Sequence, residues 1–232
     1  MDRETRRQLG GAVYRGDASE IMTLLTPERA RELPQIAGPA ILLALAADIP
    51  GAIGLAGEIV TELTERDWDG DAELTAELRH ALGQQAGTAL APVPVDLEQL
   101  VDLLQGGEHH SGGRLNVRTG EAIPEVAFAE LIDDLDENDE DADEEWLYVD
   151  ALESREAYRD MERFIAEVAP PLMAGPLSEA ISGKGAFSRF RGRIRDWPDL
   201  ADAWHLYSEE RWLGRARLWL AEAGYRPVQQ TR

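Results

Sequence analysis

Residues 198–224, PDLADAWHLYSEERWLGRARLWLAEAG, decide the fold because they form the longest helical pattern of the chain. Pro198 suits the start of a helix, and Gly224 suits its C-terminal cap. At helical spacing, one broad apolar face carries Leu206, Trp212, Leu213, Ala216, Trp219, Leu220 and Ala223. A second apolar face carries Leu200, Trp204, Tyr207 and Leu218. Two apolar faces predict burial from both sides, against the rest of its own domain, the N-terminal helices or another copy of the chain.

The residues far upstream of this helix predict further helices and no strand up to residue 82. Residues 36–57 are the most apolar stretch and raise the question of a membrane span. The uninterrupted apolar run ends at Ala47, and Asp48, Pro50 and Gly51 then break it. We therefore predict two buried helices, at about 38–47 and 51–64, in a compact array of short antiparallel helices.

Between these two helical parts, the sequence predicts a small antiparallel sheet. Residues 114–117 and 121–123 have the length of paired strands, and Gly120 suits the turn between them. Trp146 to Val149, WLYV, predicts a third strand. Asp96 can cap a helix over 97–104 that precedes the hairpin.

The expected fold class is therefore α+β and mostly helical, with an all-helical N-terminal domain followed by a three-stranded antiparallel sheet packed with helices. We expect a helical array domain over 1–85, an Ala/Pro linker over 86–94, an α+β domain over 95–226 and a tail over 227–232. The linker carries Pro92 and Pro94 and lacks helical periodicity. With 232 residues, 44% of them hydrophobic, the chain is long enough for real cores.

The charge is large and unevenly distributed. The 45 acidic and 23 basic residues give a net charge of −22, which excludes general electrostatic attraction to nucleic acid or to an anionic membrane. Residues 119–154 hold 15 acids and no base. We expect a solvated acidic interaction loop here, made of Asp133, Asp134, Asp136, Glu137, Asp139, Glu140, Asp141, Asp143, Glu144 and Glu145.

A basic segment downstream has the opposite character. Its five bases within twelve residues are Lys184, Arg189, Arg191, Arg193 and Arg195. They are a candidate binding site for an anion or a partner, although pairing with nearby carboxylates is the simpler interpretation. Gly183-Lys184-Gly185 before a helix is reminiscent of a phosphate cradle but lacks the glycine and hydroxyl spacing of a P-loop.

Metal sites and catalytic groups are weakly indicated. The acidic run approximates a calcium loop, but Asp139 stands where glycine is needed for the turn. His109 and His110 are adjacent in a glycine-flanked loop, an arrangement that rarely converges on one ion. We find no Ser/His/Asp set, no Glu-x-x-His pair and no glycine-rich dinucleotide loop, and we expect no metal, no cofactor and no enzymatic activity.

Residues 95–224 resemble a set of small acidic bacterial proteins, the uncharacterised protein family 0158. The resemblance rests on Thr119-Gly120-Glu121, the acids before Trp146, the run from Tyr158 to Ile165, and above all Gly183-Lys184-Gly185-Ala186-Phe187-Ser188-Arg189-Phe190. The region from Trp197 to Trp204 and the closing Trp219-Leu220 complete the order. The family has no established activity, so the resemblance implies a domain boundary and no mechanism.

These observations favour a non-enzymatic acidic binding or adaptor protein that acts through protein–protein contacts. One alternative is a nucleic-acid or nucleotide binder that uses the basic helix over 184–195. Another is a small-molecule binding or sequestering protein with an interdomain cleft near Trp204 and Trp212. We expect a cytoplasmic protein, because the chain has no cysteine and no apolar segment after Met1.

Overall fold

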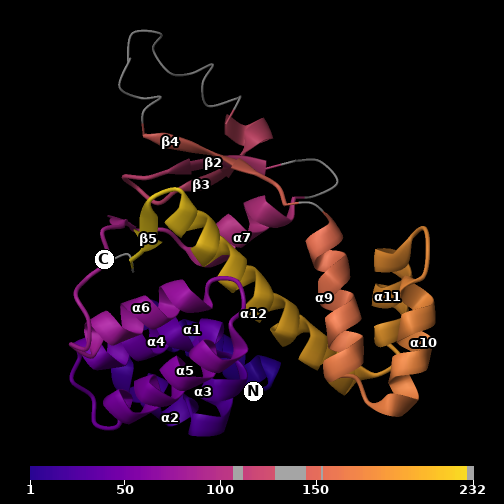
Figure 1. Ribbon diagram of the computed structural model, residues 1–232, viewed down its shortest axis with the longest axis horizontal. Coiled ribbons are helices and arrows are strands. Elements are labelled where there is room, and N and C mark those ends of the chain that lie inside the picture. Colours follow the sequence, from indigo (N-terminus) through magenta and orange to yellow (C-terminus); the bar gives the residue numbers. More distant parts are fainter. Residues whose placement is uncertain (107–111, 129–144, 153, 229–232) are drawn as a thin grey trace, which may run out of the picture. The chain divides into compact units, whose positions relative to one another are not determined.

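The protein is described by a computed structural model that covers residues 1–106, 112–128, 145–152 and 154–228 (Figure 1). Its helices are α1 (Arg3–Arg15), α2 (Ala18–Leu24), α3 (Pro27–Glu32), α4 (Pro34–Ala46), α5 (Ala52–Arg66), α6 (Asp71–Ala81), α7 (Leu97–Gln105), α9 (Ser154–Glu167), α10 (Pro171–Ile181), α11 (Ala186–Ile194) and α12 (Pro198–Glu222). Its strands are β1 (Ala91–Val93), β2 (Gly112–Asn116), β3 (Ala122–Pro124), β4 (Trp146–Asp150) and β5 (Tyr225–Pro227). The predicted class, α+β and mostly helical, is confirmed.

The chain divides into two compact units, and each unit is built from two separate stretches of sequence. The first unit consists of residues 1–86 and 154–211, and the second consists of residues 87–153 and 212–232. The first break in this division falls close to the predicted linker. Residues 154–211, however, join the N-terminal helices instead of the sheet, which differs from the predicted domain over 95–226. The physical reason is a set of buried ion pairs and hydrogen bonds that is described below.

The N-terminal helices are short, and the first three begin at a side chain that caps them. The Asp2 carboxylate accepts a hydrogen bond from the Thr5 amide at 2.8 Å, and the Asp17 carboxylate accepts one from the Glu20 amide at 3.0 Å. Thr26 caps α3 as its sequence suggests, with its hydroxyl 3.3 Å from the Arg29 amide and Pro27 in the first helical position. Helix α4 differs, because Leu33 precedes it and offers no side-chain cap.

The apolar stretch over 36–57 forms α4 and α5, which pack against each other. Among the residues that the structure describes, no helix combines the length and apolar character needed to cross a membrane. The close packing of this array is visible at Gly38 in α4. A Cβ atom there would lie 2.6 Å from Cδ2 of Leu74 in α6. The prediction of two buried helices separated by a turn is therefore confirmed, with α4 beginning earlier than expected, at Pro34.

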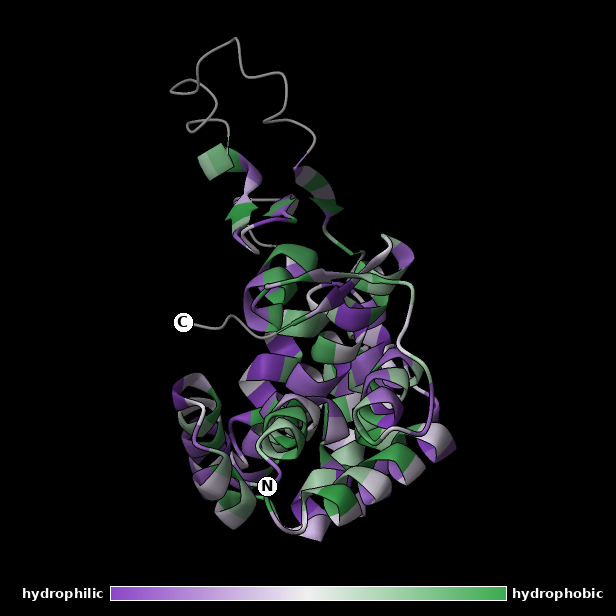
Figure 2. Ribbon diagram, turned by 90° about the vertical axis from the view of Figure 1, so that its left-hand side faces the viewer, coloured by the Kyte–Doolittle hydropathy of each residue, from purple (hydrophilic) through white to green (hydrophobic). Residues whose placement is uncertain are grey.

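The second half of the first unit packs around aromatic side chains. The ring of Phe164 from α9 lies 5.1 Å from Trp204 and 5.4 Å from Tyr207. The ring of Phe190 from α11 lies 4.9 Å from Trp204. Figure 2 shows the alternation of hydrophobic and hydrophilic residues along the helices that this one-sided burial requires.

The second unit contains the predicted antiparallel sheet, in the order β3-β2-β4. Leu115 in β2 pairs with Ala122 in β3 and with Leu147 in β4. Gly120 occupies the hairpin turn at φ +76°, and a Cβ atom there would lie 1.9 Å from the carbonyl oxygen of Pro94. Only glycine satisfies both the positive φ and the close approach.

One element of the second unit lies where a linker is predicted. Strand β1, within residues 86–94, pairs in parallel with β5, which extends to Pro227 in the predicted tail. Its pairing partner follows Gly224, whose φ of +90° turns the chain after α12. Because the strand contains Pro92 and is only three residues long, its own sequence carries little strand signal.

Candidate functional site

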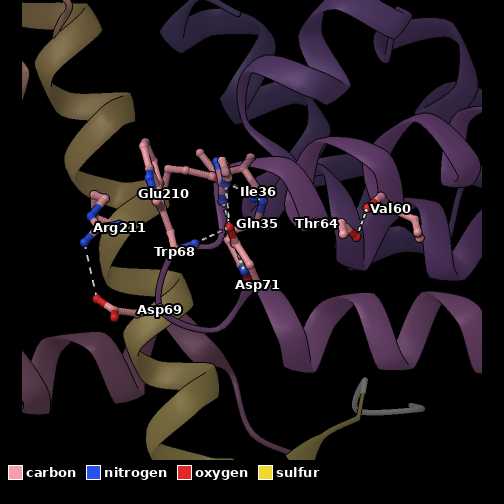
Figure 3. A network of polar contacts seen from close by, with 10 residues as sticks. Gln35, Ile36, Val60, Thr64, Trp68, Asp69, Asp71, Glu210 and Arg211 are labelled. Atoms are coloured by element: carbon pink, nitrogen blue, oxygen red, sulfur yellow. Dashed lines mark hydrogen bonds and ion pairs between the residues drawn. The ribbon is translucent and has the colours of Figure 1, made fainter.

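Two features of the first unit stand out, a buried network of charges at the middle of α12 and an exposed groove between α10 and α11. The network begins at Glu210, whose side chain is 1% exposed. Its carboxylate accepts hydrogen bonds from the Gln35 amide at 2.7 Å and from the Ile36 amide at 2.9 Å (Figure 3). These amides belong to the first turn of α4, so a residue of α12 supplies the cap that Leu33 cannot.

Arg66 joins Glu210 to the start of α6. Its Nε and Nη2 atoms donate to the Asp71 carboxylate at 2.7 and 2.8 Å, and Nη2 also donates to Glu210 at 2.7 Å. Asp71 is itself 1% exposed and accepts further hydrogen bonds from the Gln35 side-chain amide and the Trp68 backbone amide, both at 2.9 Å. The two acids therefore share one guanidinium, and each of their four carboxylate oxygens accepts at least one hydrogen bond from the protein.

The electrostatics of this cluster keep Arg66 protonated. Burial acts to lower the pKa of Arg66, but the hydrogen bonds of Asp71 and the charges of Glu210 and Asp71 outweigh it and raise the pKa. Burial is also the largest influence on Glu210 and raises the pKa of its carboxyl group, against the opposing effects of Arg66 and of the two α4 amides.

The next residue of α12, Arg211, makes a second anchor. Its Nε atom donates to Asp160 of α9 at 3.1 Å, and its Nη2 atom donates to Asp69 at 3.3 Å. The Trp68 ring lies against both guanidinium groups, with its centroid 4.3 Å from the Arg66 carbon and 4.6 Å from that of Arg211. The network thus fixes α12 to α4, α5, α9 and the turn before α6, and through Arg66 it also holds the first residue of α6. We assign it a structural role.

Tyr207 lies one turn before this network. Its hydroxyl group is buried and has no hydrogen-bond partner among the residues that the structure describes. Burial raises the pKa of Tyr207 to about 12, so the phenol is neutral at any physiological pH. The Tyr207 ring lies 5.7 Å from Trp68 and 5.4 Å from Phe164, so the side chain packs in the aromatic cluster of the first unit.

The exposed feature is the helical hairpin of α10 and α11, residues 171–197, which we call the basic hairpin. It contains five bases and two acids, a net charge of +3 on a chain of −22. All five predicted basic side chains are exposed. They do not share one face, however, because Arg189 and Arg193 form one i,i+4 pair on α11, and Arg191 and Arg195 form another.

The first of these pairs is used within the hairpin. Arg189 donates to the carbonyl oxygens of Ala180, Ser182 and Gly183 at 3.0, 2.5 and 3.3 Å, and also to that of Lys184. It therefore caps the C-terminal end of α10. Arg193 forms an ion pair with Asp196 at 3.0 Å. The carbonyl oxygens of Gly183 and Lys184 thus accept hydrogen bonds from a guanidinium. A phosphate cradle would instead present backbone N–H groups to an anion.

The remaining three bases are available to a partner. The side chains of Lys184, Arg191 and Arg195 form no ion pair or hydrogen bond with any residue that the structure describes. Beside them, a shallow groove of about 590 Å³ runs between α10 and α11. Its lining residues are Pro176, Glu179, Ala180, Arg189, Gly192, Arg193 and Asp196. Gly192 lines the groove without a side chain, and a Cβ atom there would meet nothing within 4 Å.

The other predicted sites are distributed differently. Residues 133–144 of the acidic loop, and both His109 and His110, lie outside the described residues. Glu145, the last acid of that loop, forms an ion pair with Arg118 at 2.7 Å. Within the part of the chain that the structure covers, no group of three or more potential ligands could hold a metal ion.

Trp204 and Trp212, predicted to flank a ligand cleft, are both packed. Trp204 belongs to the aromatic cluster of the first unit. Trp212 belongs to the second unit and is 5% exposed, with its ring 5.0 Å from the Arg215 guanidinium carbon. Neither indole ring lines the groove between α10 and α11.

Sequence reasoning missed the network around Glu210. A signal for it existed in two places. Glu209, Glu210 and Arg211 are three consecutive charged residues in the middle of helix α12, and the residue before Pro34 is a leucine where a capping residue is usual. Neither signal identifies its partner, because the residues are 174 or more positions apart.

These features define a mostly helical α+β protein with a buried ionic anchor and an exposed basic hairpin. Residues 125–231 match the family described as Uncharacterised protein family (UPF0158). The UPF0158 protein PA5073 of Pseudomonas aeruginosa is 26% identical over 142 residues, which are 60% of this chain and 89% of that protein. No solved structure matches the chain. The resemblance to this family is thus confirmed for the C-terminal part, and the family match leaves the N-terminal helices uncovered.

Proposed function

We propose that this protein is a non-enzymatic, cytoplasmic binding or adaptor protein, and that it acts through protein–protein contacts at the basic hairpin. The observation that carries the proposal is the exposure of Lys184, Arg191 and Arg195, without a partner in the described structure, beside an open groove. Small-molecule sites are usually concave enough to bury most of their ligand. A shallow groove between two helices suits a protein surface or segment better.

The charge of the hairpin favours a protein partner over nucleic acid. Two of the five bases are engaged within the hairpin, and the carboxylates of Glu179 and Asp196 line the groove. Proteins that bind nucleic acid through the phosphate backbone commonly neutralise many phosphates, and the affinity depends on their number. Three free bases beside two acids supply too little for that mode.

The proposal is tested by affinity capture from a lysate of the source cell. The full chain is compared with Arg191→Glu/Arg195→Glu and with Arg155→Glu/Arg159→Glu, a matched control that reverses two exposed bases at i,i+4 spacing on α9. We expect a protein that is retained by the wild type and the control and is lost with the hairpin variant. Retention of nucleic acid alone, or of a partner that all three chains bind equally, would contradict the proposal.

A further inference from the structure

The basic hairpin can be assigned a partner of defined chemistry, an inference that rests on the proposed function. Helix α11 presents its exposed residues in a fixed order around its axis. Arg189 and Arg193 lie on the groove side with Gly192, and Arg191 and Arg195 lie beyond Ser188 and Gly192. A ligand seated on Gly192 would therefore have the groove on one flank and a row of two free guanidinium groups on the other.

The shape at Gly192 fits a helix. The groove surface contains the small side chain of Ala180 and the ring of Pro176, and Gly192 adds no side chain at all. Small residues on a helix surface let a second backbone approach closely, and amphipathic helices commonly bind in grooves between helices. The length of α11, nine residues, gives a partner helix between two and three turns of contact.

The charges decide which helix fits. The free bases Lys184, Arg191 and Arg195 would be complementary to carboxylates on one side of the partner. Glu179 and Asp196 in the groove disfavour a ligand that is anionic all round. A helix can present acids on one face and small or apolar residues on the next, whereas a phosphate backbone is anionic along its whole length.

We propose that the basic hairpin docks an amphipathic, carboxylate-rich helix of a protein partner, with the helix seated on Gly192 and its acids paired with Arg191 and Arg195. Charge-assisted hydrogen bonds between guanidinium and carboxylate groups supply the specificity, and the small-residue surface supplies the close packing.

The test uses the full chain and a fluorescein-labelled, 18-residue helical peptide of Glu, Ala and Leu, with acids on one face. Fluorescence anisotropy is measured at low salt and again at physiological salt. A peptide with Gln in place of Glu and a labelled single-stranded oligodeoxynucleotide of the same length serve as comparison ligands. We expect the Glu peptide to bind more tightly than either, with an affinity that falls as salt rises.

Two variants separate the parts of the site. Arg191→Glu/Arg195→Glu should weaken binding of the Glu peptide roughly tenfold or more, while Arg155→Glu/Arg159→Glu changes it less than about twofold. Gly192→Trp should abolish binding, because the indole ring would fill the groove. The fold should tolerate the substitution, because a Cβ atom at this position meets open space. Gly54→Trp, at an equally open and exposed position of α5, is the control.

The inference is overturned if the wild type does not bind the Glu peptide, if the oligonucleotide binds more tightly, or if the hairpin variants bind as well as the wild type. If hairpin-dependent capture of a protein from the lysate persists in such a case, the proposed function stands and only the helical, acidic nature of the partner is wrong. If both experiments fail, the proposed function fails as well.

Discussion

The carboxylate of Glu210 holds the first two free amides of α4 and the guanidinium of Arg66 at the same time. A buried charge pair of this kind contributes little net stability compared with a well-packed apolar pair, but the loss of one partner leaves the other charge buried and unpaired. The two amides would also lose their acceptor, and a buried amide without a partner carries a further cost. The loss of Glu210 would leave the buried amides of Gln35 and Ile36 without this acceptor, and Arg66 with one carboxylate partner, Asp71, instead of two.

We expect Glu210→Ala to lower the free energy of unfolding by about 3–5 kcal/mol, the usual range for breaking a buried ion pair. Urea denaturation followed by circular dichroism measures the change. The control is Glu156→Ala, which breaks an exposed i,i+3 pair with Arg159 and should change stability by less than about 1 kcal/mol. Equal effects of the two substitutions would contradict the role given to Glu210.

Glu210 also gives a pH dependence of known sign. Its pKa in the folded chain lies above the ordinary value of 4.5, so the folded state holds the proton more tightly than the unfolded state. The stabilisation is present in full below the unfolded pKa and is lost as the pH rises through the folded pKa. The difference in free energy of unfolding, wild type minus Glu210→Gln, should therefore fall as the pH rises from 4.5. A difference that stays constant or grows over this range would show that the shift has the opposite sign or is absent.

The helices differ in how far their own residues determine them. Helices α1, α2, α3 and α7 begin at capping side chains in their own sequence, and the helix predicted over 97–104 is found as α7. The sheet follows from its strand lengths and from Gly120. Helix α4 starts at Pro34 because a carboxylate from α12 caps it, and no local pattern could reveal that. Strand β1 likewise depends on its pairing with β5, more than 130 residues away.

Glycines in helices give a paired test of this packing. Gly192→Ala in α11 should raise the free energy of unfolding by about 0.5–1 kcal/mol, because alanine is the better helix former and its Cβ meets open space. Gly38→Ala in α4 should lower it by about 1–3 kcal/mol, because the Cβ would overlap Leu74. Thermal or urea unfolding of both variants checks the opposite signs. Changes of the same sign would mean that one of the two environments is wrongly described.

At the level of the whole chain, helical periodicity and turn residues were enough to predict the fold class, but not the division of the chain into two units. The periodicity of α12 predicts burial on two sides and leaves three partners open. In the structure, Glu210 and Arg211 tie this part of the helix to α4, α5 and α9. The predicted basic residues are all exposed. The sequence could not show that Arg189 and Arg193 are engaged within the hairpin, because their partners are carbonyl oxygens at the end of α10 and the carboxylate of Asp196.

The discontinuous first unit predicts cooperative unfolding of segments that are far apart in sequence. Native-state hydrogen exchange should give similar opening free energies for the amides of α4 and α9, because the same network holds both. Glu210→Ala should lower both by a similar amount. Independent opening of residues 1–86, without loss of protection in α9, would contradict the assignment of residues 154–211 to this unit.

The most direct test of the central claim, that the basic hairpin is the binding surface, is photo-crosslinking of the Glu peptide to the full chain. The peptide carries a photoreactive residue on its apolar face, and mass spectrometry maps the crosslinked positions. The account predicts crosslinks concentrated within residues 171–197, lost with Gly192→Trp and kept with Gly54→Trp. Crosslinks that fall mainly elsewhere, or that persist after Gly192→Trp, would contradict it.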